Sequence, residues 1–208
     1  MSRLFRRGLL ALAAAVFTLL CAGGPAVAHG FSSTVYVHVS EADGGRLRTA
    51  VDVEYDLFVV SAADSGHDGP TNTLVTAVRS WADAEGLSLR TVTASDASDL
   101  VPGITRALDM RPDLVISAGN DLVDPLAMVT PNHLAQQFLV VGAELAEPTA
   151  NVTAVDWSGA SFRGEGLGMS STYDARSFTD RRCSAAVRAG VAAVLHGLTG
   201  IVLWLDQV

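Results

Sequence analysis

Asp113-Leu114-Val115-Ile116-Ser117 is the stretch of sequence that decides the fold. Pro112 precedes it, Gly119 follows it closely, and its apolar residues form a continuous run instead of alternating with polar ones. A strand with this pattern is buried on both faces, which is typical of a parallel sheet covered by helices on either side. Similar short runs stand at residues 57–60, 87–93, 138–141, 152–157 and 201–205.

Helical patterns separate these runs. Asn72 is expected to cap a first helix that Gly86 ends, and Ser98 and Asp99 begin a second one. Residues 125–135 form a short third helix, and Thr179 caps a fourth that carries Cys183. Strands joined through helices are linked by right-handed crossovers. The sequence therefore predicts an α/β fold, a single lobe with a doubly wound parallel sheet over residues 57–208.

The segment in front of this lobe has a different pattern. Residues 35–40 and 47–53 each alternate between apolar and polar side chains, and a turn-rich stretch at residues 41–45 separates them. Alternation on both sides of a short turn indicates a half-buried β-hairpin. We therefore expect an N-terminal β-hairpin segment at residues 29–56.

Residues 1–28 have the three parts of a secretory signal peptide. Arg3, Arg6 and Arg7 form a basic start, an apolar run follows at residues 9–20, and Ala26-Val27-Ala28 is a small-x-small cleavage site. Lipidation at Cys21 is the less favoured alternative, because Leu20 fits poorly before a lipidated cysteine. The predicted location is extracytoplasmic. Cys183 is then the one remaining cysteine, and we expect it to be a small buried hydrophobe.

The charged residues exclude several functions. All 14 basic residues are arginine, and the net charge is −8. Without lysine the chain has neither a phosphate-binding P-loop lysine nor a Schiff-base lysine. Cleavage after residue 28 would remove three arginines and no acid, which makes the chain still more acidic. Such a surface repels phosphate backbones, so a nucleic-acid partner is not expected.

In a doubly wound sheet, ligands bind beyond the carboxyl ends of the strands. Carboxylates, amides and hydroxyls follow four of the predicted strands, and such groups suit a sugar or a nucleoside. Polar loops and helix caps explain each of these residues singly, so only the set indicates a binding site. The sequence has no Gly-x-Ser-x-Gly elbow, no Cys-x-x-Cys and no His-x-x-x-His motif. We therefore expect no catalytic residue, metal or cofactor.

Three stretches together resemble the basic-membrane-protein family, which are substrate-binding proteins of ABC transporters. The first is residues 66–72, where Asp68 and Asn72 keep the spacing of the family's Asp-x-Ser-Phe-Asn turn. The second is residues 111–126, which resemble its Pro-Asp strand and the helix after it. The third is residues 151–164, which resemble its Asn-Val strand and Ser-Phe-Leu-x-Gly helix start.

The resemblance implies a periplasmic-binding-protein fold, a nucleoside-like ligand and a membrane permease as partner. The residues expected to bind the ligand are Asp68, Asn72, Gly119, Asp124, Glu144, Trp157 and Phe162. Pro70-Thr71 replaces the family's Ser-Phe pair, so Trp157 or Phe162 would have to supply the aromatic ring. Members of the family close two lobes on the ligand, whereas this chain has room for one. Pairing of two copies in a homodimer is one way to cover the ligand.

The front segment has a second resemblance. Residues 29–36 and 53–57 are similar to the extracytoplasmic start of HupE/UreJ-type accessory membrane proteins. Three alternatives to solute binding therefore stay open. These are an enzyme that uses Asp68 or Glu144 as a general base, an extracytoplasmic accessory module without a small-molecule ligand, and a degenerate fusion remnant.

Overall fold

The computed structural model describes residues 36–39, 56–62 and 69–205. Seven strands form its sheet: β1 (Tyr36–Val39), β2 (Asp56–Ala62), β3 (Ser88–Ala94), β4 (Leu114–Ala118), β5 (Gln137–Val141), β6 (Val152–Trp157) and β7 (Ile201–Leu205). The longer helices are α1 (Gly69–Glu85), α2 (Leu100–Asp109), α3 (Val123–Val129) and α4 (Asp180–Leu195). The signal peptide, Cys21, Asp68 and the predicted strand at 47–53 lie outside the described residues.

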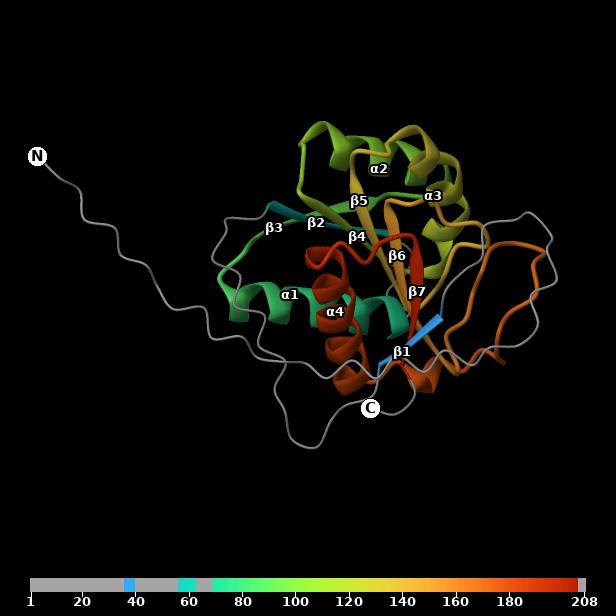
Figure 1. Cartoon of the computed structure of the whole chain (residues 1–208). Helices are drawn as coiled ribbons and strands as arrows, with labels where there is room; N and C mark the ends of the chain where they lie inside the picture. The colour runs from blue at the N-terminus through green and yellow to red at the C-terminus, as the bar shows by residue number, and fades with distance from the viewer. Residues whose placement is uncertain (1–35, 40–55, 63–68, 206–208) are drawn as a thin grey trace, which may run out of the picture. The chain divides into compact units, whose positions relative to one another are not determined.

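All strand pairs in the sheet are parallel, and the spatial order is β1-β7-β6-β5-β4-β2-β3. Ile116 of β4 pairs with Leu139 of β5, and Val141 of β5 pairs with Val155 of β6. Helices α1 and α4 cover one face of the sheet and α2 and α3 cover the other (Figure 1). The predicted doubly wound parallel α/β fold is confirmed.

The central strands are buried on both faces, as their continuous apolar runs predict. Leu114 and Ile116 pack in the cluster beneath α1 and α4, whereas Val115 between them packs in the cluster beneath α2 and α3. Cys183 of α4 is fully buried in the first cluster, and burial raises the pKa of its thiol to about 12. The expectation that this cysteine serves as a small core residue is confirmed.

The predicted hairpin lies only in part within the described residues, because its second strand is outside them. Its first strand is present as β1, but β1 pairs in parallel with β7, with Tyr36 opposite Val202 and Val39 opposite Leu205. A hairpin strand would pair with its sequence neighbour in the antiparallel sense. Residues 36–39 thus belong to the lobe's own sheet, beside β7, and among the described strands they stand at its edge.

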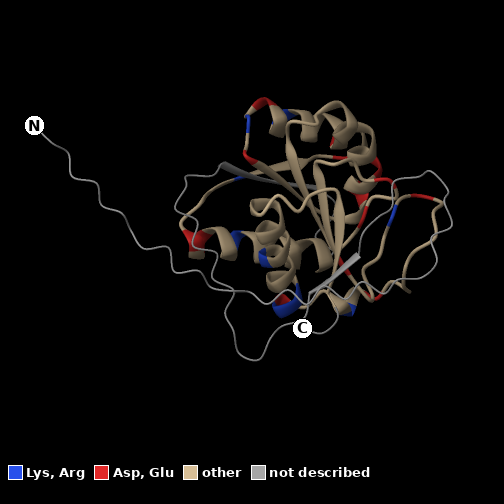
Figure 2. Ribbon diagram, in the orientation of Figure 1, with Lys and Arg blue, Asp and Glu red and all other residues tan. Residues whose placement is uncertain are grey.

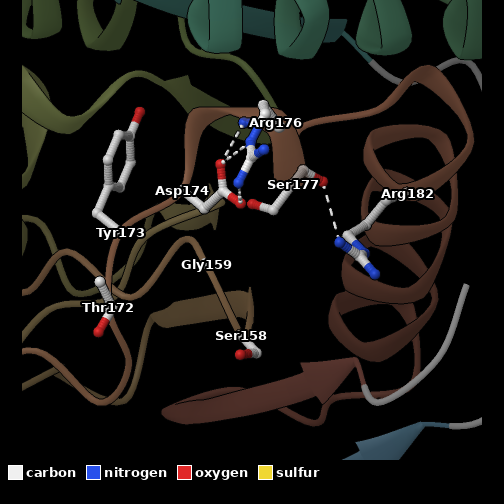
Figure 3. A pocket seen from close by; sticks show the side chains of 8 residues that line it. All are labelled: Ser158, Gly159, Thr172, Tyr173, Asp174, Arg176, Ser177 and Arg182. Carbon is white, nitrogen blue, oxygen red and sulfur yellow. Dashed lines mark hydrogen bonds and ion pairs between the residues drawn. The ribbon is translucent and has the colours of Figure 1, made fainter.

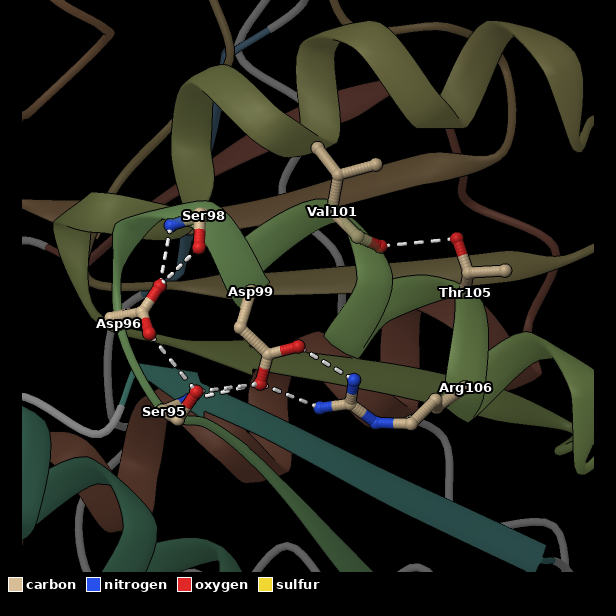
Figure 4. A network of polar contacts seen from close by, with 7 residues as sticks. All are labelled: Ser95, Asp96, Ser98, Asp99, Val101, Thr105 and Arg106. Carbon is tan, nitrogen blue, oxygen red and sulfur yellow. Dashed lines mark hydrogen bonds and ion pairs between the residues drawn. The ribbon is translucent and has the colours of Figure 1, made fainter.

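Two of the predicted helix starts agree with the structure, and one does not. Thr179 caps α4, since its Oγ1 accepts the N–H of Arg182. Asp96 caps the turn before α2 by accepting the N–H of Ser98, and Arg106 forms two hydrogen bonds with Asp99 (Figure 4). The expected cap at Asn72 is wrong, because α1 begins at Gly69 and places Asn72 in its first turn.

The carboxylates of this α2 network are held ionised. Hydrogen bonds from Arg106 keep the pKa of Asp99 well below its usual range, and those from Ser98 lower the pKa of Asp96.

The predicted third helix is shorter than expected. It ends at Val129, and a single turn of 3-10 helix (Thr130–Asn132) follows, because Pro131 has no N–H to continue the α-helical hydrogen bonds.

Candidate functional site

The strand order reverses direction between β2 and β4. From β2 the chain crosses to β3 at one edge, and then returns past β2 to β4 and onward to β7. Helix α1 therefore leaves β2 on one face of the sheet, while α3 follows β4 on the other face. A crevice opens at such a switch point, beyond the carboxyl ends of the two strands. The predicted residues Asn72, Gly119 and Asp124 belong to the segments that border it.

Gly119 brings the loop after β4 against the first turn of α1. Its φ is +111°, a conformation that favours glycine, and a Cβ atom there would lie 3.0 Å from Oγ1 of Thr71. Asn72, next to Thr71, is exposed. The structure therefore brings Asn72 and Gly119 to one edge, as the sequence predicts, with Gly119 contributing its backbone.

Asp124 joins this edge to the loop after β6. It lies in the first turn of α3, and its Oδ2 accepts the N–H of Glu165 at 3.1 Å. Gly164 has a φ of +123°, and a Cβ atom there would lie 2.7 Å from Oδ1 of Asp124. Gly164 therefore permits close packing here, whereas an added Cβ atom at Gly166 or Gly168 would have no neighbour within 4 Å. Asp124 stays exposed while it holds the loop.

Glu144 follows β5 but points into the protein. Its side chain is 1% exposed, and its Oε1 lies 2.9 Å from Nε of Arg163. Its backbone N–H donates to the carbonyl of Phe162 at 2.9 Å. Burial raises the pKa of Glu144 to about 7, helped by the negative charge of Asp156 and opposed by Arg163 and a hydrogen bond from Ser170. In this conformation Glu144 fastens the loop after β6 and is not open to a ligand.

Asp156, the second buried acid, organises the turn after β6. It is fully buried, and its Oδ1 accepts the N–H groups of Trp157 at 2.7 Å and Ser161 at 2.8 Å. Burial raises its pKa to about 6 against these two hydrogen bonds. Ser161 has a φ of +50°, and its Oγ lies 2.8 Å from Oγ of Ser171. The turn is therefore folded around the carboxylate.

Neither predicted aromatic residue offers an open ring in this conformation. Trp157 is fully buried, its Nε1 donates to Ser177 Oγ at 2.9 Å, and its ring meets the edge of Phe178 with centroids 5.0 Å apart. A ligand could stack on Trp157 only after the ring left the core, so the stacking expected of it is corrected here to a packing role. Phe162 is half-buried against the cluster beneath α2 and α3.

A cavity of about 730 Å³ lies beside the carboxyl end of β6 and the N-terminal end of α4. Figure 3 shows its lining side chains, which come from the turn after β6, the segment before α4 and α4 itself. The lining residues are Ser158, Gly159, Thr172, Tyr173, Asp174, Arg176, Ser177 and Arg182. The size falls within the range of small-molecule sites, roughly 300–1,000 Å³.

Two arginines border this cavity with different partners. Arg176 forms two hydrogen bonds with Asp174, each 3.0 Å long, which raise its own pKa and lower that of Asp174. Arg182 donates from Nη1 to the carbonyl of Ser177 at 3.1 Å. Its Nε is shielded from solvent and has no acceptor within the described part of the chain.

None of the residues predicted to bind a ligand lines this cavity. Sequence reasoning placed Ser158 after a strand but passed over the segment from 172 to 182. Its signal was three arginines within seven residues, Arg176, Arg181 and Arg182, next to several hydroxyl residues in an acidic chain. In the sequence alone, that composition is typical of a solvated surface. Only the fold places this segment beside the carboxyl end of β6.

The structure describes residues 36–39, 56–62 and 69–205. Within these ranges, no three His, Cys, Asp or Glu side chains gather in a way that could hold a metal ion. In the same ranges, no helix is long and apolar enough to cross a membrane. Asn151, which begins a glycosylation sequon, is buried, and its Nδ2 donates to the carbonyls of Thr130, His133 and Gln136. Asn151 therefore has a structural role in the folded chain.

The sequence matches no protein-family model and no curated protein. Among solved structures, the chain is similar to a fragment named "putative lipoprotein" from Peptoclostridium difficile 630, at 16% identity and a TM-score of 0.50. That similarity covers 70% of this chain and 100% of the fragment. At this identity it shows the fold alone.

The chain also has a weaker similarity to ABC transporter solute-binding proteins. For the one from Aeropyrum pernix K1 the identity is 18% and the TM-score 0.44, covering 50% of this chain and 29% of that protein. For the one from Conexibacter woesei DSM 14684 the identity is 20% and the TM-score 0.41. That similarity covers 49% of this chain and 35% of that protein. The chain thus spans about a third of the length of these two proteins, and their TM-scores add nothing to the fold assignment.

Proposed function

We propose that this chain is an exported single-lobe solute-binding protein that holds a small polar molecule at the carboxyl edge of its sheet. The observation that carries the proposal is the polar cavity beside the end of β6, on a doubly wound parallel sheet. Ligands of such sheets bind at this edge because the loops and helix N-termini converge there. A resemblance to the basic-membrane-protein family, seen in the sequence, supports the same role.

The exposed residues at the switch point form the second part of the proposed binding edge. Asn72 and Asp124 offer an amide and a carboxylate, and Gly119 lets the two segments approach closely. Asp68 lies outside the described residues and directly precedes α1 in the sequence. Hydroxyl-rich solutes such as nucleosides would suit these acceptors. Glu144 supports this edge from the interior of the protein, because its ion pair with Arg163 fixes the loop after β6.

We propose binding without catalysis. Glu144 and Asp156 have raised pKa values, but both are buried and bonded to the loop that they hold. Cys183 is buried and its thiol has a raised pKa, which makes it a poor nucleophile. A turnover assay on any solute that binds distinguishes this proposal from an enzyme.

We also propose a membrane permease of an ABC transporter as partner, and an extracytoplasmic location. The signal-like residues 1–28 support export, and the family resemblance supports the permease. A permease gene and an ATPase gene next to this one would agree with both.

A ligand screen by thermal denaturation tests the proposed function. A solute at about 100 times its Kd stabilises the folded form by about 2.7 kcal/mol. For a chain of this size that corresponds to a rise in Tm of roughly 5–10 °C. We expect at least one compound in a panel of nucleosides, nucleotides, sugars, amino acids and dicarboxylates to produce such a rise. If no compound in the panel shifts the Tm, the proposal is wrong.

Matched variants localise the site. Asp124→Asn is expected to reduce the shift produced by a hydroxyl-rich ligand, because the carboxylate accepts two hydrogen bonds where the amide oxygen is a weaker acceptor. Asp109→Asn is the control, since it makes the same change on an exposed residue at the C-terminal end of α2. Equal loss in both variants would contradict a site at the edge that carries Asp124.

Exposed apolar side chains favour a second candidate, an accessory module that binds a protein partner. Leu167 and Met169, on the loop between β6 and α4, are 51% and 48% exposed. Co-purification with a membrane protein that is lost in Leu167→Asp and kept in Asp68→Ala would support this candidate. Co-purification kept in both variants would contradict it.

A further inference from the structure

We propose that the cavity beside α4 receives an anionic group of the solute, a carboxylate or a phosphate, and that Arg182 is its main cationic contact. This inference rests on the proposed function and adds a chemical class for part of the ligand. It starts from where the positive charge of an acidic chain is placed.

Two arginines of this acidic chain line the cavity. The chain has a net charge of −8, yet Arg176, Arg181 and Arg182 fall within seven residues. Basic segments gather at the N-terminal end of α4 and on the turn before it (Figure 2). Arg176 and Arg182 line the cavity directly, and Asp174 is the single acid in the lining.

The helix itself makes this placement costly without an anion. Helix α4 has 16 residues, and Arg181 and Arg182 lie in its first turn together with Asp180. The N-terminal end of a helix carries a partial positive charge, so cations there are unfavourable and anions favourable. Folding alone would favour arginines at the other end of α4. A bound anion would interact favourably with Arg182 and with this end of the helix.

The two lining arginines differ in what they can still bind. Asp174 already takes two hydrogen bonds from Arg176, which leaves that pair close to neutral. Arg182 uses one N–H on the Ser177 carbonyl, and its shielded Nε has no acceptor among the described residues. A guanidinium has five N–H donors in a planar fork. Because Nε is shielded, a forked contact with a ligand would come from the remaining N–H groups of Nη1 and Nη2.

Hydroxyl groups complete the surroundings of this guanidinium. Ser158 and Thr172 also line the cavity, together with the Asp174–Arg176 pair (Figure 3). Arginine binds carboxylate and phosphate oxygens in pairs, and neighbouring hydroxyls donate to the remaining oxygens. A cavity of about 730 Å³ suits a small solute. The acidic remainder of the chain opposes a large polyanion.

Matched pairs of probes test this inference by titration calorimetry on the full chain in buffer without phosphate. Adenosine is compared with its 5′-monophosphate, succinate with neutral succinamide, and inorganic phosphate is titrated alone. We expect the anionic member of at least one pair to bind about ten-fold or more tightly than its neutral partner. A preference in the nucleotide pair identifies a phosphate, and one in the succinate pair identifies a carboxylate.

Two variants of α4 assign the effect to Arg182. Arg182→Gln is expected to weaken the anionic probe about 10- to 100-fold and to leave the neutral partner unchanged. Arg188→Gln, on an exposed position of the same helix, is expected to change neither. If Arg182→Gln does not fold, Arg182→Lys keeps the charge but not the fork, and it should weaken the anionic probe several-fold.

The results separate this inference from the proposed function. Neutral solutes that bind as tightly as their anionic partners would overturn the anionic site and leave solute binding intact. Equal anion affinity in the unaltered chain and the tested Arg182 variant would overturn the role of Arg182. If neither neutral nor anionic probes bind, the inference fails together with the proposed function.

Discussion

Replacing Gly190 with valine is expected to destabilise the lobe by about 3–5 kcal/mol. Gly190 lies in the middle of α4, where the helix packs directly on β5 and β6. A Cβ atom there would overlap Cδ1 of Leu139 and lie 2.9 Å from Cγ2 of Val155. Both neighbours are fully buried, and protein cores are closely packed. Overpacking a closed core costs typically 1–3 kcal/mol, and the two methyl groups of valine add to that.

Alanine variants provide the matched comparison for this site. Gly190→Ala gains up to about 1 kcal/mol of helix propensity and still meets the overlap with Leu139, so we expect a net loss. Gly103→Ala in α2 makes the same change, but its Cβ would lie 3.6 Å from that of Ala94, an ordinary contact. We expect Gly103→Ala to be neutral or stabilising. Urea unfolding measures both, and equal stability changes would contradict the close approach of α4.

The free energy of unfolding is expected to fall by about 2–4 kcal/mol between pH 5 and pH 8. Glu144 and Asp156 have folded pKa values of about 7 and 6, above the ordinary values of 4.5 and 3.8. In this range the folded state therefore binds more protons than the unfolded state, and stability decreases as the pH rises. At pH 8 both buried acids are ionised beside one cation, Arg163.

Amide variants separate this effect from other titrations. Glu144→Gln together with Asp156→Asn mimics the protonated acids, and the amide oxygen introduced by Asp156→Asn can still accept the N–H groups of Trp157 and Ser161. We expect the double variant to lose most of the pH dependence when urea unfolding is measured at pH 5, 6, 7 and 8. The lowered pKa values of Asp96, Asp99 and Asp174 affect stability only at more acidic pH. An unaltered chain equally stable at pH 5 and pH 8 would refute the prediction.

The proposed binding edge could be predicted only in part. Local sequence patterns place some of its residues, whereas contacts between distant segments place the others. Gly119 and Asp124 stand directly after an apolar strand, so parallel strands had to bring them to the same edge as the first turn of α1. The direction of the Glu144 side chain could not be predicted in this way. It depends on Arg163, which is 19 positions further along the chain and reaches Glu144 only through the folded loop.

By itself, the sequence determined the parallel α/β architecture, the cap at Thr179 and the burial of Cys183. These features follow from local patterns, because apolar runs, capping residues and helical spacing act over a few neighbouring residues. Only the tertiary structure decided that β1 joins β7, that Trp157 fills the core and that the segment before α4 lines a cavity beside the end of β6. Each of these features depends on packing between segments that are distant in sequence. Local sequence patterns do not indicate which distant segment packs against a given residue.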